Sequence, residues 1–264
     1  MCDTCGCNIT PANRQLVYRP ANSGNAVTAV SVLTHLLARN NDAAGHNRMH
    51  LDKHGVLAVN LMSSPGAGKT SLLEATIDAL KDEFRIAVIE GDLETENDAR
   101  RIRARGVPAI QITTGSACHL DAHMVHEALH ELSLDDVDIL FIENVGNLVC
   151  PASFDLGQHR HVVLLAVTEG DDKPAKYPVM FRVAEAVLIT KTDLLPHLDD
   201  FSIDDASRHV RELANAAPIM PLSARKHIGL DTWLDWLRSE AAVRRSRPAA
   251  GSVPGHASAP IAAE

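Results

Sequence analysis

A glycine-rich turn at residues 63–71 contains the residue types, at the right spacing, that bind a chain of phosphates. Its sequence, SSPGAGKTS, directly follows the apolar run VLAVNLM. Small residues let backbone N–H groups point at phosphate oxygens, Lys69 can reach the β and γ phosphates, and the Thr70 hydroxyl can bind Mg²⁺. The pattern G-x-x-x-x-G-K-[ST] is complete except at its first position, which is Ser63. The residues expected to contact the nucleotide here are Gly66, Ala67, Gly68, Lys69, Thr70 and Ser71.

Two later apolar runs end in carboxylates, at the end of a parallel strand where ligands gather. The run RIAVIEGD ends at Asp92, which we expect to bind Mg²⁺ through water or to orient the attacking water. The alternative is that Asp92 caps the following helix. The run DILFIEN contains Glu143, placed to support Mg²⁺, and Gly146 follows where its N–H can meet the γ-phosphate. Lys69, Asp92 and Glu143 are thus the expected catalytic residues.

The residues after the run AVLIT are suited to recognising a base. The stem of Lys191 can lie over a purine, while the Asp193 carboxylate can accept hydrogen bonds from N1–H and the N2 amino group of guanine. Adenine has neither donor, which separates the two bases by roughly a few kcal/mol. Ser223 and Ala224 follow the last expected strand, where a backbone N–H can bind guanine O6. The sequence therefore predicts GTP as the nucleotide.

The N-terminal run MCDTCGC is suited to a soft metal ion. Cys2, Cys5 and Cys7 offer three thiolates in the first seven residues, and the glycine between them lets the backbone fold back. Thiolates at this density favour Ni²⁺, Zn²⁺ or Cu⁺ over Mg²⁺, and both nickel and zinc remain open. A redox-active C-x-x-C pair is the alternative, although it would need a thioredoxin-like context.

A second group of soft ligands follows two of the expected strands. Cys118 and His119 are adjacent, and Cys150 lies four residues beyond Gly146. A lone cysteine before proline is often a small buried apolar residue, but this position next to the expected γ-phosphate sensor favours metal binding. Beyond it, His119, His123, His126 and His130 follow the period of one helix face. These histidines either form a solvent-exposed helix face, or they bind metal or lie at a subunit contact.

The pattern of apolar runs predicts an α/β fold with a mostly parallel sheet and helices on both faces. Residues 1–54 are expected to be a flexible metal-binding extension with one helix at 27–39 and a linker at 40–50. Residues 55–243 would form the nucleotide-binding domain. The segment 244–264 is rich in proline, alanine, glycine and serine, and is expected to be a disordered tail. The remaining strands are expected at 108–113, 160–167, 186–190 and 218–223, with helices at 70–82 and 230–239.

Composition narrows the function classes further. The formal net charge of −9 argues against nucleic-acid binding, and the chain lacks an apolar stretch long enough to span a membrane. The N-terminus has no basic and apolar leader, and five cysteines cannot all pair with one another. We therefore expect a cytoplasmic protein with reduced thiols.

Together, MCDTCGC, SSPGAGKT, EGD, ENVGNLVCP, EGDDKPAKYPVMF and the TKTD and SAR elements resemble the HypB family, the nickel-incorporation GTPases of hydrogenase maturation. The resemblance covers nearly the whole chain. It implies a SIMIBI-class P-loop GTPase fold, GTP-dependent dimerisation, a partnership with the maturation protein HypA, and nickel delivery to the large subunit of [NiFe]-hydrogenase. The metal ligands that it implies are Cys2, Cys5 and Cys7 for a high-affinity nickel site, and Cys118, His119 and Cys150 for a second nickel or zinc site.

Two departures from the family pattern stand out. Thr190 occupies the position of the asparagine in the guanine-reading N-K-x-D element, which affects base affinity more than base choice. The long histidine-rich tract that some members have after the cysteine run is missing, which argues against bulk nickel storage.

We therefore expect a slow GTPase metallochaperone in which GTP binding reorders residues 143–150 and so changes metal affinity and dimer contacts together. A P-loop kinase for small molecules is one alternative, although it would not need Asp193 or the cysteine run. A metal-storage protein with a vestigial phosphate loop is another. The third alternative is the sister GTPase of urease maturation, which the cysteine run and Cys150 both argue against.

Overall fold

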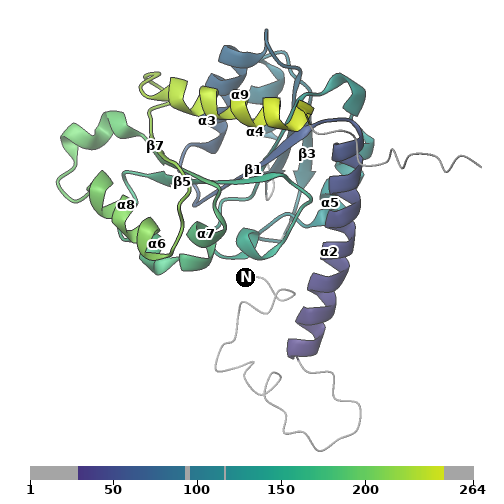
Figure 1. Cartoon of the computed structure of the whole chain (residues 1–264), viewed down its shortest axis with the longest axis horizontal. Coiled ribbons are helices and arrows are strands. Elements are labelled where there is room, and N and C mark those ends of the chain that lie inside the picture. Colours follow the sequence, from purple (N-terminus) through teal and green to yellow (C-terminus); the bar gives the residue numbers. More distant parts are fainter. Residues whose placement is uncertain (1–28, 93–95, 116, 247–264) are drawn as a thin grey trace, which may run out of the picture.

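The protein folds around a parallel sheet with helices on both faces (Figure 1). The computed structural model describes residues 29–92, 96–115 and 117–246; the expected metal ligands Cys2, Cys5 and Cys7, and most of the expected C-terminal tail, lie outside them. Seven strands lie in the order β3-β2-β4-β1-β5-β6-β7, and every neighbouring pair is parallel. The strands are β1 Leu57–Ser63, β2 Ile86–Asp92, β3 Ala109–Thr113, β4 Ile139–Glu143, β5 Arg160–Ala166, β6 Ala186–Thr190 and β7 Ile219–Pro221. The predicted fold class is confirmed.

Both faces of the sheet are covered, which explains why its strands are apolar at nearly every position. Leu57, Val59 and Leu61 pack in the layer that contains α3, α4 and α9, whereas Ala58 packs in the layer of α2 and α5. Helices α7 and α8 extend that second layer below β5 and β6 (Figure 1). The α-helices are α2 Ala29–Lys53, α3 Lys69–Leu80, α4 Asn97–Arg103, α5 Ala122–His130, α6 Lys173–Lys176, α7 Pro178–Val183, α8 Ile203–Glu212 and α9 Leu230–Ser246.

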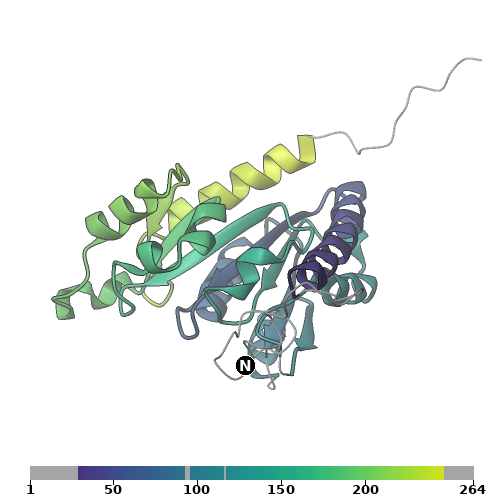
Figure 2. The same ribbon diagram turned by 90° about the horizontal axis from the view of Figure 1, so that it is seen from below.

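Helix α2 is longer than the sequence suggests and lies beside α5 (Figures 1 and 2). The predicted linker at 40–50 is wrong, because this segment is helical throughout. Asn47 fixes it to the rest of the protein by donating hydrogen bonds to the carbonyls of Ala122 at 2.8 Å and Leu156 at 3.0 Å. Asparagine and glycine disfavour an isolated helix, but buried tertiary contacts outweigh that preference here.

Helix α9 continues beyond the predicted start of the tail. It ends at Ser246, so residues 244–246 are helical and not part of a disordered tail. Arg244 pairs with Asp52, and an Arg245 nitrogen lies 3.1 Å from a carboxylate oxygen of Asp138. These ion pairs join the last turn of α9 to residues at the amino-terminal ends of the strands. None of the helices that the structure describes is both long enough and apolar enough to cross a membrane.

Candidate functional site

The predicted nucleotide residues line two adjoining hollows at the carboxyl ends of the strands. The larger, of about 500 Å³, contains the expected phosphate and magnesium residues, and the smaller, of about 300 Å³, contains the expected base residues. Gly68, Ser71 and Lys191 line both, so the two hollows are neighbours, and together we call them the nucleotide groove. The predicted residues lining the first are Gly66, Gly68, Lys69, Thr70, Ser71, Asp92, Glu143, Gly146 and Lys191, and those lining the second include Ala67, Asp193, Ser223 and Ala224.

The phosphate loop has the backbone conformation that its glycines allow. Gly66 and Gly68 have φ angles of 76° and 99°, in the left-handed region that side chains disfavour. Helix α3 begins directly after the loop, so its unpaired N–H groups face the larger hollow. Lys69 Nζ donates to Ser63 Oγ at 3.1 Å. The serine that departs from the sequence pattern therefore holds the phosphate-binding lysine in place.

Three carboxylates meet beside Thr70. The Thr70 hydroxyl donates to Glu143 Oε1 at 2.9 Å, and Glu90 lies directly opposite Glu143 in the pairing of β2 with β4. Oxygen atoms of Glu90, Glu143 and Asp98 lie within 4.8 Å of one another. Burial, and then the Glu143 carboxylate, raise the pKa of Glu90 to about 11, and burial also raises the pKa of Glu143. Glu90 is therefore protonated at neutral pH when the cleft contains no cation.

This acidic cluster fits a hard divalent cation. The second carboxylate oxygens of Glu90 and Glu143 are buried and have no hydrogen-bond partner in the part of the chain that the structure describes. Mg²⁺ prefers such oxygen ligands and would satisfy both atoms. Asp92 is half-buried at the same cleft, and the residue that caps α4 is Glu96, so the alternative role of Asp92 as that cap is wrong. Sequence reasoning missed Glu90 and Asp98; the Glu-Gly-Asp triplet at the end of β2 was the available signal for Glu90.

Gly146 packs directly against the phosphate loop. A Cβ atom at this position would lie 2.8 Å from Pro65 Cα and 2.9 Å from Pro65 N, closer than real contacts allow. Only glycine therefore permits the segment after β4 to approach the loop this closely. Gly146 thus lies beside the phosphate loop, and contact of its N–H with the γ-phosphate stays a prediction.

The base end of the groove is held together by two hydroxyl groups. Ser223 Oγ donates to Asp193 Oδ1 at 2.5 Å, which leaves the other carboxylate oxygen free to turn to a base. Thr190 Oγ1 donates to the Ala67 carbonyl at 2.7 Å, and both residues are buried. Thr190 thus ties the base loop to the phosphate loop.

Cys118, His119 and Cys150 come together as predicted. Their ligand atoms lie within 4.8 Å of one another, and the two sulfur atoms are 3.1 Å apart without a disulfide bond between them. The His119 ring lies against Phe154 with ring centroids 3.9 Å apart, and burial lowers the pKa of His119. A neutral imidazole and two thiols, of which only Cys118 is partly exposed, form a suitable ligand set for Ni²⁺ or Zn²⁺.

The metal cluster and the nucleotide cleft share one segment of the chain. Residues 143–150 begin at the acidic cluster, touch the phosphate loop through Gly146, and end at Cys150. Asn144 Oδ1 accepts from the Leu120 N–H at 3.2 Å, and Asn147 Nδ2 donates to the Cys118 carbonyl at 3.3 Å. This segment therefore contacts both the phosphate loop and the residues around Cys118.

Comparison with known proteins identifies the family. The family model described as the CobW/HypB/UreG nucleotide-binding domain matches residues 57–221. Hydrogenase maturation factor HypB of Escherichia coli K12 is 52% identical over 205 residues, which cover 78% of this chain and 70% of the relative. The chain belongs to the HypB family. HypB of Rhizobium leguminosarum is 51% identical over 221 residues, covering 83% of this chain and 73% of its own.

Solved HypB structures share this fold. HypB from Helicobacter pylori in complex with nickel superposes with a TM-score of 0.75 at 42% identity, covering 78% of this chain and 97% of that one. HypB from Archaeoglobus fulgidus gives a TM-score of 0.73 at 39% identity, covering 78% of this chain and all of that one (100%). The expected resemblance to HypB and the P-loop fold are confirmed.

The histidine stripe of this HypB-family chain differs from the sequence prediction. His119 precedes α5 and is buried, so it does not belong to the helical stripe. His123 and His130 are exposed, as expected, whereas His126 is half-buried and contacts Asn47 on α2. The stripe therefore faces α2 along part of its length.

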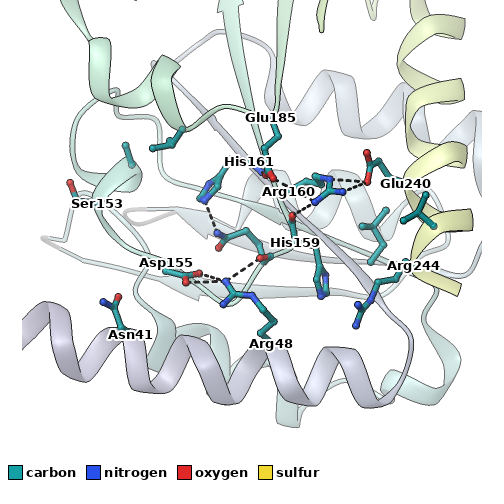
Figure 3. A pocket seen from close by; sticks show the side chains of 15 residues that line it. Asn41, Arg48, Ser153, Asp155, His159, Arg160, His161, Glu185, Glu240 and Arg244 are labelled. Carbon is teal, nitrogen blue, oxygen red and sulfur yellow. Dashed lines mark hydrogen bonds and ion pairs between the residues drawn. The ribbon is translucent and has the colours of Figure 1, made fainter. Parts of the chain in front are cut away.

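A larger hollow of about 550 Å³ lies at the opposite end of β5 (Figure 3). Two of its three arginines are paired with carboxylates of the same pocket: Arg48 with Asp155 at 2.8 Å, and Arg160 with Glu240 at 2.6 Å. The third, Arg244, is paired with Asp52 beside it. These pairs neutralise the charges that an anionic ligand would need. The phosphate-binding features of this HypB-family chain are instead at the carboxyl ends of the strands.

Proposed function

We propose that this chain is a GTP-hydrolysing metallochaperone that binds Ni²⁺ or Zn²⁺ and delivers nickel during [NiFe]-hydrogenase maturation. The observation that supports this most strongly is the single segment 143–150, which joins an acidic magnesium site, the phosphate loop and the thiol of Cys150. A small-molecule kinase or a storage protein would not need this connection. The printed names of the relatives, and the nickel bound to the Helicobacter pylori protein, support the same function.

In this proposal Lys69 binds the β and γ phosphates, while Thr70, Asp92 and Glu143 hold Mg²⁺ and position water. The cation would neutralise the charge that develops on the phosphates during hydrolysis. Arg101 lines the cleft, but its guanidinium is paired with Glu74 at 2.7 Å and with Asp98 at 2.8 Å. Because this arginine is held away from the phosphates, we expect slow turnover of GTP to GDP and phosphate.

Base recognition rests on Asp193. Ser223 orients its carboxylate by a hydrogen bond. Thr190, at the position of the family's asparagine, donates a hydrogen bond to the phosphate loop. An acceptor at this position pairs with the N1–H and N2 amino groups of guanine and would stay unpaired against adenine. We therefore infer that the nucleotide is GTP despite the altered base-reading element.

Metal binding and nucleotide binding are coupled in this proposal. If nucleotide changes the affinity of Cys118, His119 and Cys150 for metal, metal must change nucleotide affinity by the same factor. The N-terminal thiols Cys2, Cys5 and Cys7 would form the tighter nickel site. The expected partners are a second copy of the chain when GTP or metal is bound, the protein HypA and the hydrogenase large subunit, all in the cytoplasm.

A nickel titration tests this function. The full chain and a chain lacking residues 1–8 are each titrated with Ni²⁺ in the presence of Mg²⁺ and either GDP or a non-hydrolysable GTP analogue. We expect truncation to remove one tight site, and the remaining site to change affinity with nucleotide. The Cys150→Ser variant of the truncated chain should lose that remaining site.

The two parts of the proposal can fail separately. Equal nickel affinity with both nucleotides would refute the coupling through residues 143–150 and leave a GTPase that binds metal without gating it. Hydrolysis of ATP as fast as GTP would refute the base assignment to Asp193.

A further inference from the structure

Four histidines from two helices meet on the surface between α2 and α5. The rings of His126 and His130 on α5 have centroids 4.6 Å apart, and His50 on α2 lies 5.8 Å from His130. His54, just after α2, lies 5.2 Å from His50. Along α5, His126 lies about 6 Å and His130 about 12 Å from the first residue of the helix, at about 1.5 Å per residue. Cys118 precedes the start of α5, and the group of ligand atoms that it forms with His119 and Cys150 includes none of these four histidines.

The tautomer of His126 follows from its partner on α2. Asn47 uses its amide nitrogen to donate to the carbonyls of Ala122 and Leu156, so its Oδ1 atom must be an acceptor. His126 Nδ1 lies 2.8 Å from that oxygen and is therefore the protonated nitrogen. In a neutral ring the other nitrogen, Nε2, then has a free lone pair. A buried amide thus holds the imidazole in the orientation and tautomer of a metal ligand.

The lone pair of His126 points at His130. The two Nε2 atoms are 3.1 Å apart, and the residues are one helical turn apart on the same face of α5. Two nitrogens bonded to one metal ion at about 2.05 Å each are 3.1 Å apart when the angle at the metal is about 98°. That angle lies between square-planar and tetrahedral geometry. The observed spacing therefore suits a shared metal ion without a change in the helix.

A hydrogen-bond partner also fixes the ring of His54. Its Nδ1 lies 2.7 Å from an Asp135 carboxylate oxygen, a partner that holds the proton on Nδ1 and leaves Nε2 as the free nitrogen. Two histidines at the ends of the cluster thus have partners that fix their rings, and His50 and His130 lie between them.

We propose that His126 and His130 form a surface site for a late first-row transition-metal ion such as Zn²⁺ or Ni²⁺, which His50 joins when its side chain turns toward them. Imidazole nitrogens favour these ions over Mg²⁺. Because His130 is exposed, the ion would exchange readily with solvent or with a partner, unlike an ion at the half-buried cysteine cluster. The site goes beyond the proposed GTPase function and does not depend on it.

The test uses the full chain labelled with ¹⁵N-histidine and titrated with Zn²⁺, which is diamagnetic. Imidazole ¹H–¹⁵N spectra should show Nδ1-protonated His126 before metal is added. As Zn²⁺ is added, the Nε2 signals of His126 and His130 should shift together. In parallel, competition with a chromophoric chelator counts the bound ions in the wild type, His126→Gln/His130→Gln, and the single variant His130→Gln. The control is His197→Gln, an exposed histidine outside the cluster.

The proposal expects the double variant to bind one Zn²⁺ fewer than wild type and the control to bind the same number. The single variant, whose side chain is exposed, keeps the test valid if the double variant unfolds, and it should weaken this site at least about tenfold. Equal stoichiometry in all four proteins, or unshifted Nε2 signals, would show that the His126–His130 contact is only an N–H···N hydrogen bond. The opposite tautomer of His126 would also refute the proposal.

Discussion

The pair of carboxylates at the ends of β2 and β4 makes the pH dependence of stability a direct test of the site. Burial and the neighbouring Glu143 raise the pKa of Glu90 from about 4.5 to about 11. The unfolded chain loses this proton as the pH rises past 4.5, whereas the folded chain keeps it. The stabilisation that protonated Glu90 contributes to the folded state is therefore fully present below the pKa of the unfolded chain. It decreases as the pH rises from that value to the pKa of the folded chain. We predict that Glu90→Gln removes this loss.

The magnitude follows from proton linkage. One proton difference between the folded and unfolded states changes the free energy of unfolding by about 1.4 kcal/mol for each pH unit. From about pH 5.5 to about pH 7.5, the wild type should lose about 2.7 kcal/mol that Glu90→Gln does not lose. The glutamine has nearly the shape of a protonated glutamate, so the variant should be close to wild type at the acidic end and more stable at neutral pH.

Urea unfolding of the chain, without nucleotide and with a chelator of divalent cations, measures the difference at each pH. Titrating groups that do not contact Glu90 are common to both proteins and cancel in the difference, whereas Glu143, whose pKa depends on Glu90, is part of the effect that the difference measures. Glu127→Gln, on the exposed face of α5, is the matched control and should show no such pH-dependent gain. A difference between Glu90→Gln and wild type that does not change with pH would mean that Glu90 is ionised in the folded protein, and would refute the assignment.

Three further substitutions test the contacts of the nucleotide groove. Gly146→Ala should destabilise the protein by about 1–3 kcal/mol in urea unfolding, because its methyl group would overlap the Pro65 backbone; Gly45→Ala, which meets nothing within 4 Å, should not, and equal stability of the two variants would contradict the close approach. Thr190→Val leaves a phosphate-loop carbonyl unpaired and should cost about 1–3 kcal/mol, whereas Thr190→Ser keeps the hydroxyl; a valine variant as stable as the serine variant would contradict this. Asp193→Asn should lower GTP affinity at least about tenfold with little change for ATP in equilibrium titrations, and an equal effect on both nucleotides would argue against base recognition.

Several parts of the site could be predicted, either because their residues are close in the chain or because they follow strands of one parallel sheet. The phosphate loop is contiguous, from Ser63 to Ser71, so residue types and spacing were sufficient. Cys118 and Cys150 each follow an apolar run, and the carboxyl ends of parallel strands meet at one edge of the sheet. Their 3.1 Å separation is a consequence of that rule, together with the short segment after β4.

Other features depended on register and on the docking of helices. Glu90 lies opposite Glu143 only because β2 and β4 pair in one particular register, and sequence periodicity does not specify register between strands that are far apart in the chain. The helical segment at 40–50 contains asparagine and glycine, which locally favour a turn. Its conformation is decided by buried hydrogen bonds from Asn47 to carbonyls that are 75 and 109 residues away.

The sequence by itself thus determined the residue types available to this HypB-family chain: a phosphate loop, a carboxylate expected to read guanine, and thiols and an imidazole after strand ends. Only the tertiary structure decided which polar groups contact one another, and so which of them keep a proton or donate a hydrogen bond. Glu90 with Glu143, Thr190 with Ala67, and His126 with Asn47 are such pairs. The physical reason is that secondary structure follows from local periodicity, whereas the energy of a buried polar group depends on partners brought to it from distant parts of the chain.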